Sequence, residues 1–209
     1  MTVTLHDYWR STASYRVRIA LAFAGIDWRG QGVDLLRGDQ RGGGHLDLNP
    51  QGLVPVLEID GAHLTQSLAI VEYLDETRAL GLMPSDPLDR ARVRAVAYAI
   101  AMEIHPVCNL RVARFAVEKS AGTLTMQGWM REFIAPGLVA VERLIDGGPT
   151  CLGGRVSLAD LCLFPQIYNA QRWDVDLGGL PKIQRVIAHL SQMPQFTQTA
   201  PENVRPMTA

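Results

Sequence analysis

The sequence predicts an α/β domain over residues 1–81, followed by an all-helical domain over residues 88–209. In the first part, stretches that alternate in polarity as strands do give way repeatedly to stretches with the 3.6-residue period of amphipathic helices. In the second part only the helical period remains. Pro84 and Pro87 interrupt the pattern between the two parts, so we place the domain boundary there.

The chain opens with a predicted β-α-β unit. Val3–Tyr8 has the composition of a strand, and apolar residues then recur at helical spacing from Ser14 to a glycine stop at Gly25. Trp28–Leu36 supplies a second strand with Val33 on its apolar side. A glycine-rich loop with room for a short helix follows, and it completes the unit.

A hairpin and a helix complete the first domain. Val54–Ile59 and Ala62–Leu64 are two short strands joined by Asp60-Gly61, a dipeptide that favours a type I′ turn. An amphipathic helix is expected from Thr65.

The second domain is expected to contain four helical segments, at about residues 88–118, 124–146, 158–171 and 181–192. Ser157 and Asp160 have the spacing of a capping box at the start of the third segment.

The composition excludes several classes of protein. The chain has 209 residues, 47% hydrophobic content and a formal net charge of −1, which predicts a soluble globular protein without a global attraction to nucleic acid or anionic membranes. No apolar run approaches the ~20 residues that span a bilayer, and no targeting segment is recognisable, so we expect a cytoplasmic location. Its three cysteines and five histidines show no metal-ligand spacing, and we expect no metal site.

The stretch Tyr8–Leu21, YWRSTASYRVRIAL, places hydroxyl residues where a strand turns into a helix. Ser11 and Thr12 could simply cap the helix, and one hydroxyl is enough for that role. The same hydroxyls and the positive end of the helix also stabilise an anion or a thiolate. No cysteine of the chain lies here, so a thiolate at this corner would arrive with a ligand.

A second cluster comprises Val54-Pro55 and Gln66-Ser67. The proline could mark an edge strand, and Ser67 could cap its helix. A cis bond before Pro55 would instead turn the Val54 backbone groups outward to pair with an extended peptide, while Ser67 and the first helix amides could take a carboxylate. Together these groups suit a short peptide with an acidic end.

Three arginines form the third cluster: Arg10, Arg111 and Arg172. Arginines usually lie on solvated helix faces. Arg10 differs because it follows an aromatic pair at a strand end, where many α/β proteins bind ligands.

The segments YWRSTASYRVRIALAFAGIDW, LNPQGLVPVLEIDG, LTQSLAIVEYLDETR and SLADLCLFPQIYNAQRWDVDL resemble the zeta class of the glutathione transferase superfamily, over almost the whole chain. The resemblance implies a thioredoxin-like N-terminal domain, an all-helical C-terminal domain, glutathione as cofactor and a homodimer.

The resemblance also implies roles for individual residues. The opening serine motif of the family falls on residues 11–14, so the Ser11 hydroxyl would meet the glutathione sulfur with Thr12 beside it. Val54 would pair with the cysteinyl backbone of glutathione, and Gln66 and Ser67 would hold its γ-glutamyl carboxylate.

For the second domain and the substrate, the resemblance implies that Arg10, Arg111 and Arg172 surround an acidic substrate. Arg10 would join Ser11 and Thr12 as a catalytic residue. His105 and Asn109 share the H-P-x-x-N-x-R pattern with Arg111 and are expected at the glutathione site.

Two positions depart from the family pattern. Ala13 replaces the family cysteine, which removes any role of that thiol, and Leu53 stands where many members carry glutamine. Neither change touches the expected thiolate site at Ser11.

The activity implied is glutathione-dependent cis-trans isomerisation of a maleyl diketo acid, maleylacetoacetate or maleylpyruvate, in the catabolism of aromatic amino acids or aromatic acids. The thiolate of glutathione would add reversibly to the double bond and free it to rotate. Two alternatives stay open: a general glutathione transferase acting on small α-haloacids, and a non-catalytic glutathione- or ligand-binding protein. The sequence does not distinguish the two maleyl substrates.

Overall fold

The computed structural model describes residues 2–205. They form two compact units, of which the first runs to Leu82 and takes in the chain again from Met193, while the second spans Met83–Gln192.

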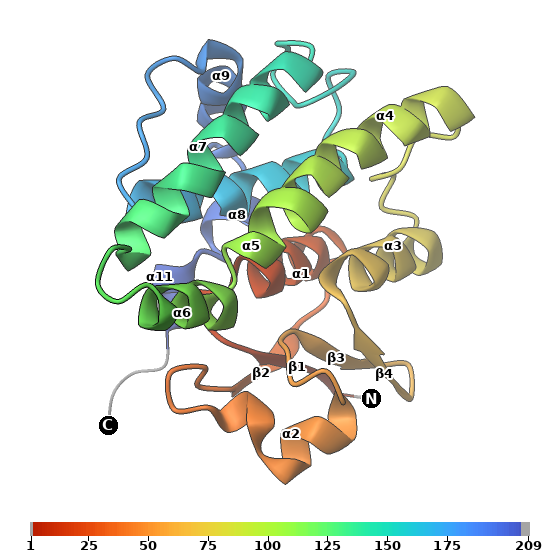
Figure 1. The fold of residues 1–209 in the computed structure, drawn as a ribbon. Coiled ribbons are helices and arrows are strands. Elements are labelled where there is room, and N and C mark those ends of the chain that lie inside the picture. The colour runs from red at the N-terminus through yellow and green to blue at the C-terminus, as the bar shows by residue number, and fades with distance from the viewer. Residues whose placement is uncertain (1, 206–209) are drawn as a thin grey trace. The chain divides into compact units, whose positions relative to one another are not determined.

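The first unit is built on a four-stranded sheet of order β2-β1-β3-β4. Its strands are β1 (Val3–Asp7), β2 (Trp28–Gly32), β3 (Val56–Ile59) and β4 (Ala62–Thr65). β1 pairs in parallel with β2 and antiparallel with β3, and β3 pairs antiparallel with β4. Helices α1 (Thr12–Phe23) and α3 (Ser67–Arg78) cover one face, and α2 (Gly43–Leu48) lies on the other side (Figure 1). This is the thioredoxin-like arrangement that the resemblance implied.

The second strand is shorter than predicted. It ends at Gly32, so Val33 lies outside it. Among the described residues β2 pairs with β1 alone, and β1 ends at Asp7. The pairing therefore stops after the hydrogen bond from the Val33 N–H to the Asp7 carbonyl at 2.7 Å. A single-turn helix, η1 (Asp39–Arg41), precedes α2 in the glycine-rich loop.

The hairpin between β3 and β4 turns as predicted. Asp60 and Gly61 have φ angles of 52° and 80°, and a type I′ turn requires positive φ at both central positions. The helix after the hairpin begins at Ser67 rather than Thr65, because Thr65 still pairs with Val56 in the sheet.

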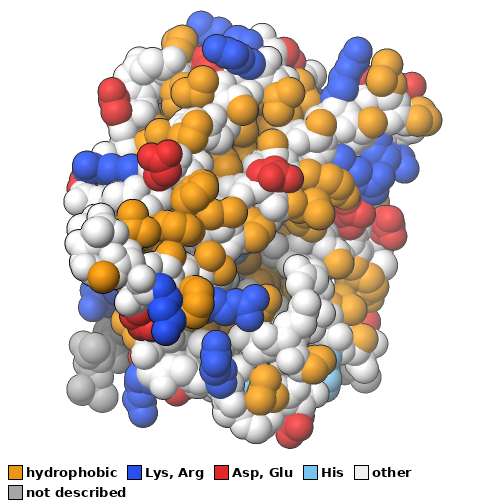
Figure 2. All heavy atoms as spheres, viewed as in Figure 1, with side chains coloured by type: hydrophobic (Ala, Val, Ile, Leu, Met, Phe, Trp, Pro, Cys, Tyr) orange, Lys and Arg blue, Asp and Glu red, His pale blue; other side chains and the backbone are white. Residues whose placement is uncertain are grey.

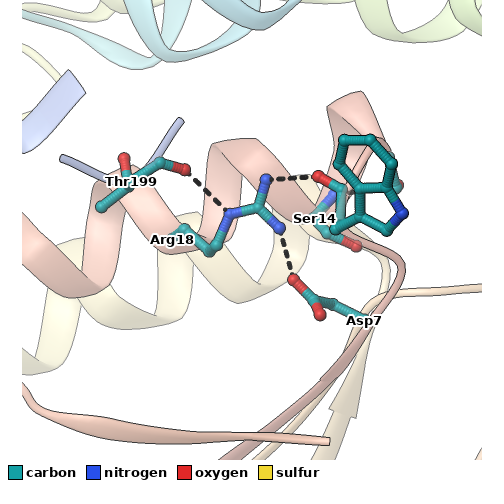
Figure 3. A network of polar contacts seen from close by, with 6 residues as sticks. Asp7, Ser14, Arg18 and Thr199 are labelled. Carbon is teal, nitrogen blue, oxygen red and sulfur yellow. Dashed lines mark hydrogen bonds and ion pairs between the residues drawn. The ribbon is translucent and has the colours of Figure 1, made fainter. Parts of the chain in front are cut away.

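Helix α1 begins at Thr12, two residues before the predicted start, and it buries two arginines, Arg16 and Arg18. The Arg18 guanidinium forms an ion pair with Asp7 and donates to the carbonyls of Trp9 and Thr199, both at 3.0 Å (Figure 3). Burial raises the pKa of Asp7, although Arg18 opposes the shift. Arg18 therefore ties the C-terminal segment to the start of the chain.

The C-terminal segment contains two short helices, α10 (Pro194–Thr197) and α11 (Pro201–Val204). The Tyr15 hydroxyl donates to the Phe196 carbonyl at 2.6 Å, and α10 packs against α1.

The second unit is helical, but the single helix predicted over residues 88–118 is wrong. It is four pieces: α4 (Pro87–Tyr98), a π-helical turn η2 (Ala99–Ile104), α5 (His105–Val107) and α6 (Leu110–Lys119). Two residues explain the interruption, because Pro106 donates no backbone hydrogen bond and Asn109 has extended backbone angles and caps α6. The remaining helices are α7 (Met126–Leu144), α8 (Leu158–Arg172) and α9 (Pro181–Leu190).

The capping box predicted at the start of α8 is present. The buried Asp160 carboxylate accepts from the backbone N–H and the hydroxyl of Ser157, both at 2.8 Å, and from the Cys151 N–H at 2.7 Å.

Acidic and basic side chains are interspersed on the face drawn in Figure 2. Within residues 2–205, no helix combines the length and apolarity needed to cross a membrane. The same residues contain no group of three or more His, Cys, Asp or Glu side chains arranged to hold a metal ion.

Candidate functional site

Three of the predicted site segments emerge at one edge of the sheet. In the β1–β3 pairing His6 lies opposite Val56, and in the β3–β4 pairing Val56 lies opposite Thr65. The chain therefore leaves β1 toward Ser11, enters β3 from Val54 and leaves β4 toward Ser67 at the same edge. The sheet register brings Ser11 to the same edge as Val54 and Ser67, which follow it by more than forty residues in the sequence.

Ser11 is the N-cap of α1, as its simpler interpretation predicted. Its Oγ accepts the Ser14 backbone N–H at 3.2 Å. Because Oγ accepts in this bond, the Ser11 hydroxyl hydrogen stays available to donate elsewhere. Ser11 is partly exposed and Thr12 is buried, so the cap offers one outward donor at the positive end of a helix.

None of the three cysteines belongs to the first unit. Ala13 stands beside Ser11, and the cysteines all lie in the second unit, where they are buried and form no disulfide. Burial raises the pKa of Cys108 to about 11 and raises that of Cys151 well above its ordinary value. These thiols are therefore protonated and poorly nucleophilic at neutral pH.

Val54 presents an unused pair of backbone groups. The Val54-Pro55 peptide bond is cis, and within residues 2–205 neither the N–H nor the C=O of Val54 has a hydrogen-bond partner. The preceding residue is held in place, since the Leu53 carbonyl accepts from His45 Nε2 and Asn49 Nδ2, both at 2.9 Å. A donor and an acceptor on one half-buried residue can pair with an extended peptide as a further strand would.

The start of α3 has no side-chain cap. Gln66 occupies the N-cap position with φ 66° and ψ 110°, and its amide donates to Gln51 Oε1 at 2.7 Å instead. Ser67 is therefore the first helical residue rather than the cap. Within the described chain, the backbone N–H groups of residues 67–69 have no acceptor. A helix of 12 residues with free first amides attracts a carboxylate.

Arg16 contacts the predicted site residue Ser67, which the sequence analysis did not anticipate. Its side chain is 1% exposed, and its Nη1 donates to Ser67 Oγ at 3.2 Å. The signal in the sequence was an arginine among apolar residues of an otherwise buried helix, and it required knowledge of the α1–α3 packing to interpret.

Arg10 lies where the sequence predicted, at the turn after β1. Its guanidinium carbon lies 4.3 Å from the centroid of the Trp9 ring, and that of Arg205 lies 5.0 Å from the same centroid. The buried Arg10 Nε has no hydrogen-bond partner within residues 2–205. The indole thus stabilises two cations at the same corner as Ser11.

The other predicted residues belong to the helical unit. His105 opens α5, and Asn109 caps α6 by accepting the Arg111 N–H at 3.1 Å. Arg111 is exposed on α6, and Arg172 is the exposed last residue of α8, with its guanidinium 5.3 Å from the Trp173 ring centroid. Asn109 therefore has a structural role of its own.

The chain is similar to known proteins along its whole length. Residues 10–77 match the sequence model for the glutathione S-transferase N-terminal domain. The maleylacetoacetate isomerase of Rhizobium meliloti (strain 1021) is 52% identical over 207 residues, which is 97% of each chain.

Two solved structures extend this similarity to three dimensions. A maleyl pyruvate isomerase described as a bacterial zeta-class glutathione transferase is 34% identical with a TM-score of 0.92, covering 98% of this chain and 100% of the other. A maleylacetoacetate isomerase from Anaeromyxobacter dehalogenans 2CP-1, with glutathione bound in its active site, is 38% identical with a TM-score of 0.87 over 98% and 97% of the two chains.

Proposed function

Because the chain belongs to the zeta class of the glutathione transferase superfamily, we propose that it is a glutathione-dependent cis-trans isomerase of a maleyl diketo acid, maleylacetoacetate or maleylpyruvate. The observation that carries the proposal is the shared sheet edge, where a hydroxyl donor, a free peptide group and an uncapped helix start meet.

These groups fit glutathione part by part. The hydroxyl of Ser11 is free to donate to the sulfur, and Thr12 lies beside it. The unpaired N–H and C=O of Val54 match the peptide groups of the cysteinyl residue. The free amides at the start of α3, with Gln66 and Ser67, match the γ-glutamyl carboxylate.

When bound, glutathione supplies the thiolate that adds reversibly to the substrate double bond. The residues of this chain have to keep the sulfur ionised and to hold the substrate. A hydroxyl donor and the positive end of α1 both favour thiolate over thiol. Glutathione provides the sulfur in this proposal, because all three cysteines of the chain are buried in the second unit and burial raises the pKa of Cys108 and Cys151.

The substrate is a dianion, and arginines are suited to hold it. Guanidinium groups bind carboxylates in a fixed, two-pronged geometry and stabilise negative charge that develops during a reaction. We propose Arg10 for this role in the first unit and Arg111 and Arg172 in the second. The unpartnered Nε of Arg10 and the exposure of the other two support it.

Further parts of the proposal rest on the family. We propose that His105 and Asn109 contribute to the glutathione site and that the enzyme is a cytoplasmic homodimer. We also propose residues 1–81 and 88–209 as its two domains along the sequence, although the chain from Met193 onward packs with the first unit.

The test follows the ultraviolet absorbance of freshly prepared maleylacetoacetate and maleylpyruvate with the purified protein, with and without glutathione. Glutathione-dependent conversion to the fumaryl isomer is expected, and the preferred substrate identifies the pathway. Arg10→Ala should lower kcat/KM at least about tenfold, whereas Arg92→Ala, which removes an exposed arginine paired with Asp89, should not. Glutathione binding without conversion of either substrate would refute the isomerase and favour haloacid conjugation or a carrier.

A further inference from the structure

A buried guanidinium lies directly behind the proposed carboxylate site. Arg16 of α1 is 1% exposed, and its Nη1 donates to the Oγ of Ser67, the first residue of α3, at 3.2 Å. Ser67 itself is 6% exposed. α1 and α3 pack against each other within the first unit, so this bond is formed before any ligand is present.

The chemistry of the two groups fixes the direction of the bond. A guanidinium has donors and no acceptor, so Ser67 Oγ must accept in this bond. The Ser67 hydroxyl hydrogen is then available to donate to another acceptor. This oxygen caps no backbone N–H of α3, and within residues 2–205 the Ser67 side chain makes no hydrogen bond besides the one with Arg16.

We propose that Arg16 is a positioning residue for glutathione, which holds Ser67 as a hydrogen-bond donor toward the γ-glutamyl carboxylate. Arg16 acts through Ser67 and does not itself contact the ligand. The inference rests on the proposed function, because it assigns a role within the glutathione site.

Arg18 provides a matched comparison on the same helix. It is equally buried, at 0% exposure, but its donors go to Asp7, Trp9 and Thr199, none of which belongs to the carboxylate site. If both buried arginines of α1 were only structural, Arg16→Met and Arg18→Met would have the same effect on ligand binding. The proposal requires that only Arg16→Met weaken the binding of the γ-glutamyl carboxylate.

The test measures dissociation constants by calorimetry for two ligands. One is glutathione, and the other is 4-aminobutyryl-cysteinylglycine, which is glutathione without the γ-glutamyl carboxylate. Arg16→Met should weaken glutathione binding about tenfold and leave the binding of the analogue unchanged. Arg16→Lys, which keeps a donor, should restore part of the loss, and Arg18→Met should leave the ratio of the two constants as in the wild type.

Ser67→Ala tests the other partner of the same hydrogen bond. It should weaken glutathione binding as much as Arg16→Met does. The double variant should lose no more glutathione affinity than either single variant, because both changes remove the same hydrogen bond. The inference would be overturned if Arg16→Met weakened the binding of both ligands equally, or if the losses of glutathione affinity were additive in the double variant. A wild-type protein that binds no glutathione would overturn the proposed function itself.

Discussion

The starts of α8 and α3 contrast two uses of a helix N-terminus. At α8, the chain satisfies its own groups: Asp160 is fully buried and accepts from both donors of Ser157 and from the Cys151 N–H. At α3, the N-cap residue Gln66 offers no side-chain cap, and the first amides remain free. Both starts contain a buried serine, so the difference lies in what surrounds the serine.

This difference separates stability from binding. Every helix leaves four N–H groups without an intrahelical acceptor, and a folded chain has to satisfy them or leave them for a ligand. At the α8 start, the acidic residue of the capping box, Asp160, accepts the donors of Ser157 and Cys151. At α3, where Gln66 is the N-cap, the third helical residue is Ala69, whose side chain can accept nothing, and Arg16 supplies a further donor instead. We infer that the α3 start is kept open for an anion, and the following changes test the contrast.

The largest effect on stability is expected at Asp160, the acidic residue of the α8 capping box. In Asp160→Asn an amide nitrogen would face backbone donors, so at least one charge-assisted hydrogen bond is lost in a buried site, and we expect a loss of about 3 kcal/mol in the free energy of unfolding. Urea denaturation measures it. The exposed Asp89→Asn is the control, with an expected change within about 0.5 kcal/mol.

Glutathione affinity provides the second arm of this experiment. The folded fraction of Asp160→Asn should bind glutathione as the wild type does, because the α8 start holds no ligand in our proposal. A large loss of glutathione affinity under conditions where Asp160→Asn is fully folded would show that the α8 start is not purely structural.

The same substitution at both starts gives the sharpest comparison. Ser157→Ala removes the hydrogen bond to the Asp160 carboxylate together with the capping-box contact of the serine, and Ser67→Ala removes the hydrogen bond to Arg16. Each variant should lose about 1–2 kcal/mol in the free energy of unfolding. Only Ser67→Ala should weaken glutathione binding, about tenfold by calorimetry. If both variants bound glutathione equally well, the α3 start would not be the carboxylate site.

The sequence predicted the α8 start more completely than the α3 start, for a physical reason. A capping box is local: Ser157 and Asp160 lie three residues apart, and their spacing is enough to predict the contact. The type I′ turn at Asp60-Gly61 is local in the same way, and it was also predicted correctly.

The missed features depend on partners distant in the chain. The end of β2 at Gly32 is set by the end of β1, and the start of α3 is set by the pairing of Thr65 with Val56. The Arg16 contact spans 51 residues. Periodicity predicts one buried face for α1, whereas every residue from Thr12 to Leu21 is buried, and periodicity cannot specify that an arginine of this helix meets a serine on α3.

Gln66 tests whether the open start is held at a cost in stability. Its positive φ is unfavourable for a side chain with a Cβ, so Gln66→Gly should leave the free energy of unfolding unchanged or raise it by up to about 1 kcal/mol. Glutathione affinity should fall several-fold, because the loop before Ser67 loses its defined conformation and its Gln51 contact.

Ala79→Gly is the control at the other end of α3. Ala79 has φ 52° and ψ 46° at the C-cap, where glycine is favoured, so the variant should gain stability by up to about 1 kcal/mol without a change in affinity. A glutathione affinity that changed equally in both variants would show that helix stability, rather than the geometry of its start, controls binding.

The smallest effect is expected at the anchored half of α3. Tyr73 and Arg78 both donate to Asp60 Oδ2 at 2.6 Å, and these hydrogen bonds hold the pKa of Asp60 below its ordinary value of 3.8. A carboxyl group whose pKa is lowered by folding adds stability above its unfolded pKa and loses that contribution as the pH falls through its folded pKa. Tyr73→Phe removes the larger cause of the shift.

The wild type should therefore have a higher Tm than Tyr73→Phe at pH 7, and this difference should shrink below about pH 4, with glutathione affinity at pH 7 unchanged. A margin independent of pH would show that the Asp60 contact does not anchor the helix electrostatically, whereas a loss of affinity would show that the anchored half and the open start of α3 are coupled.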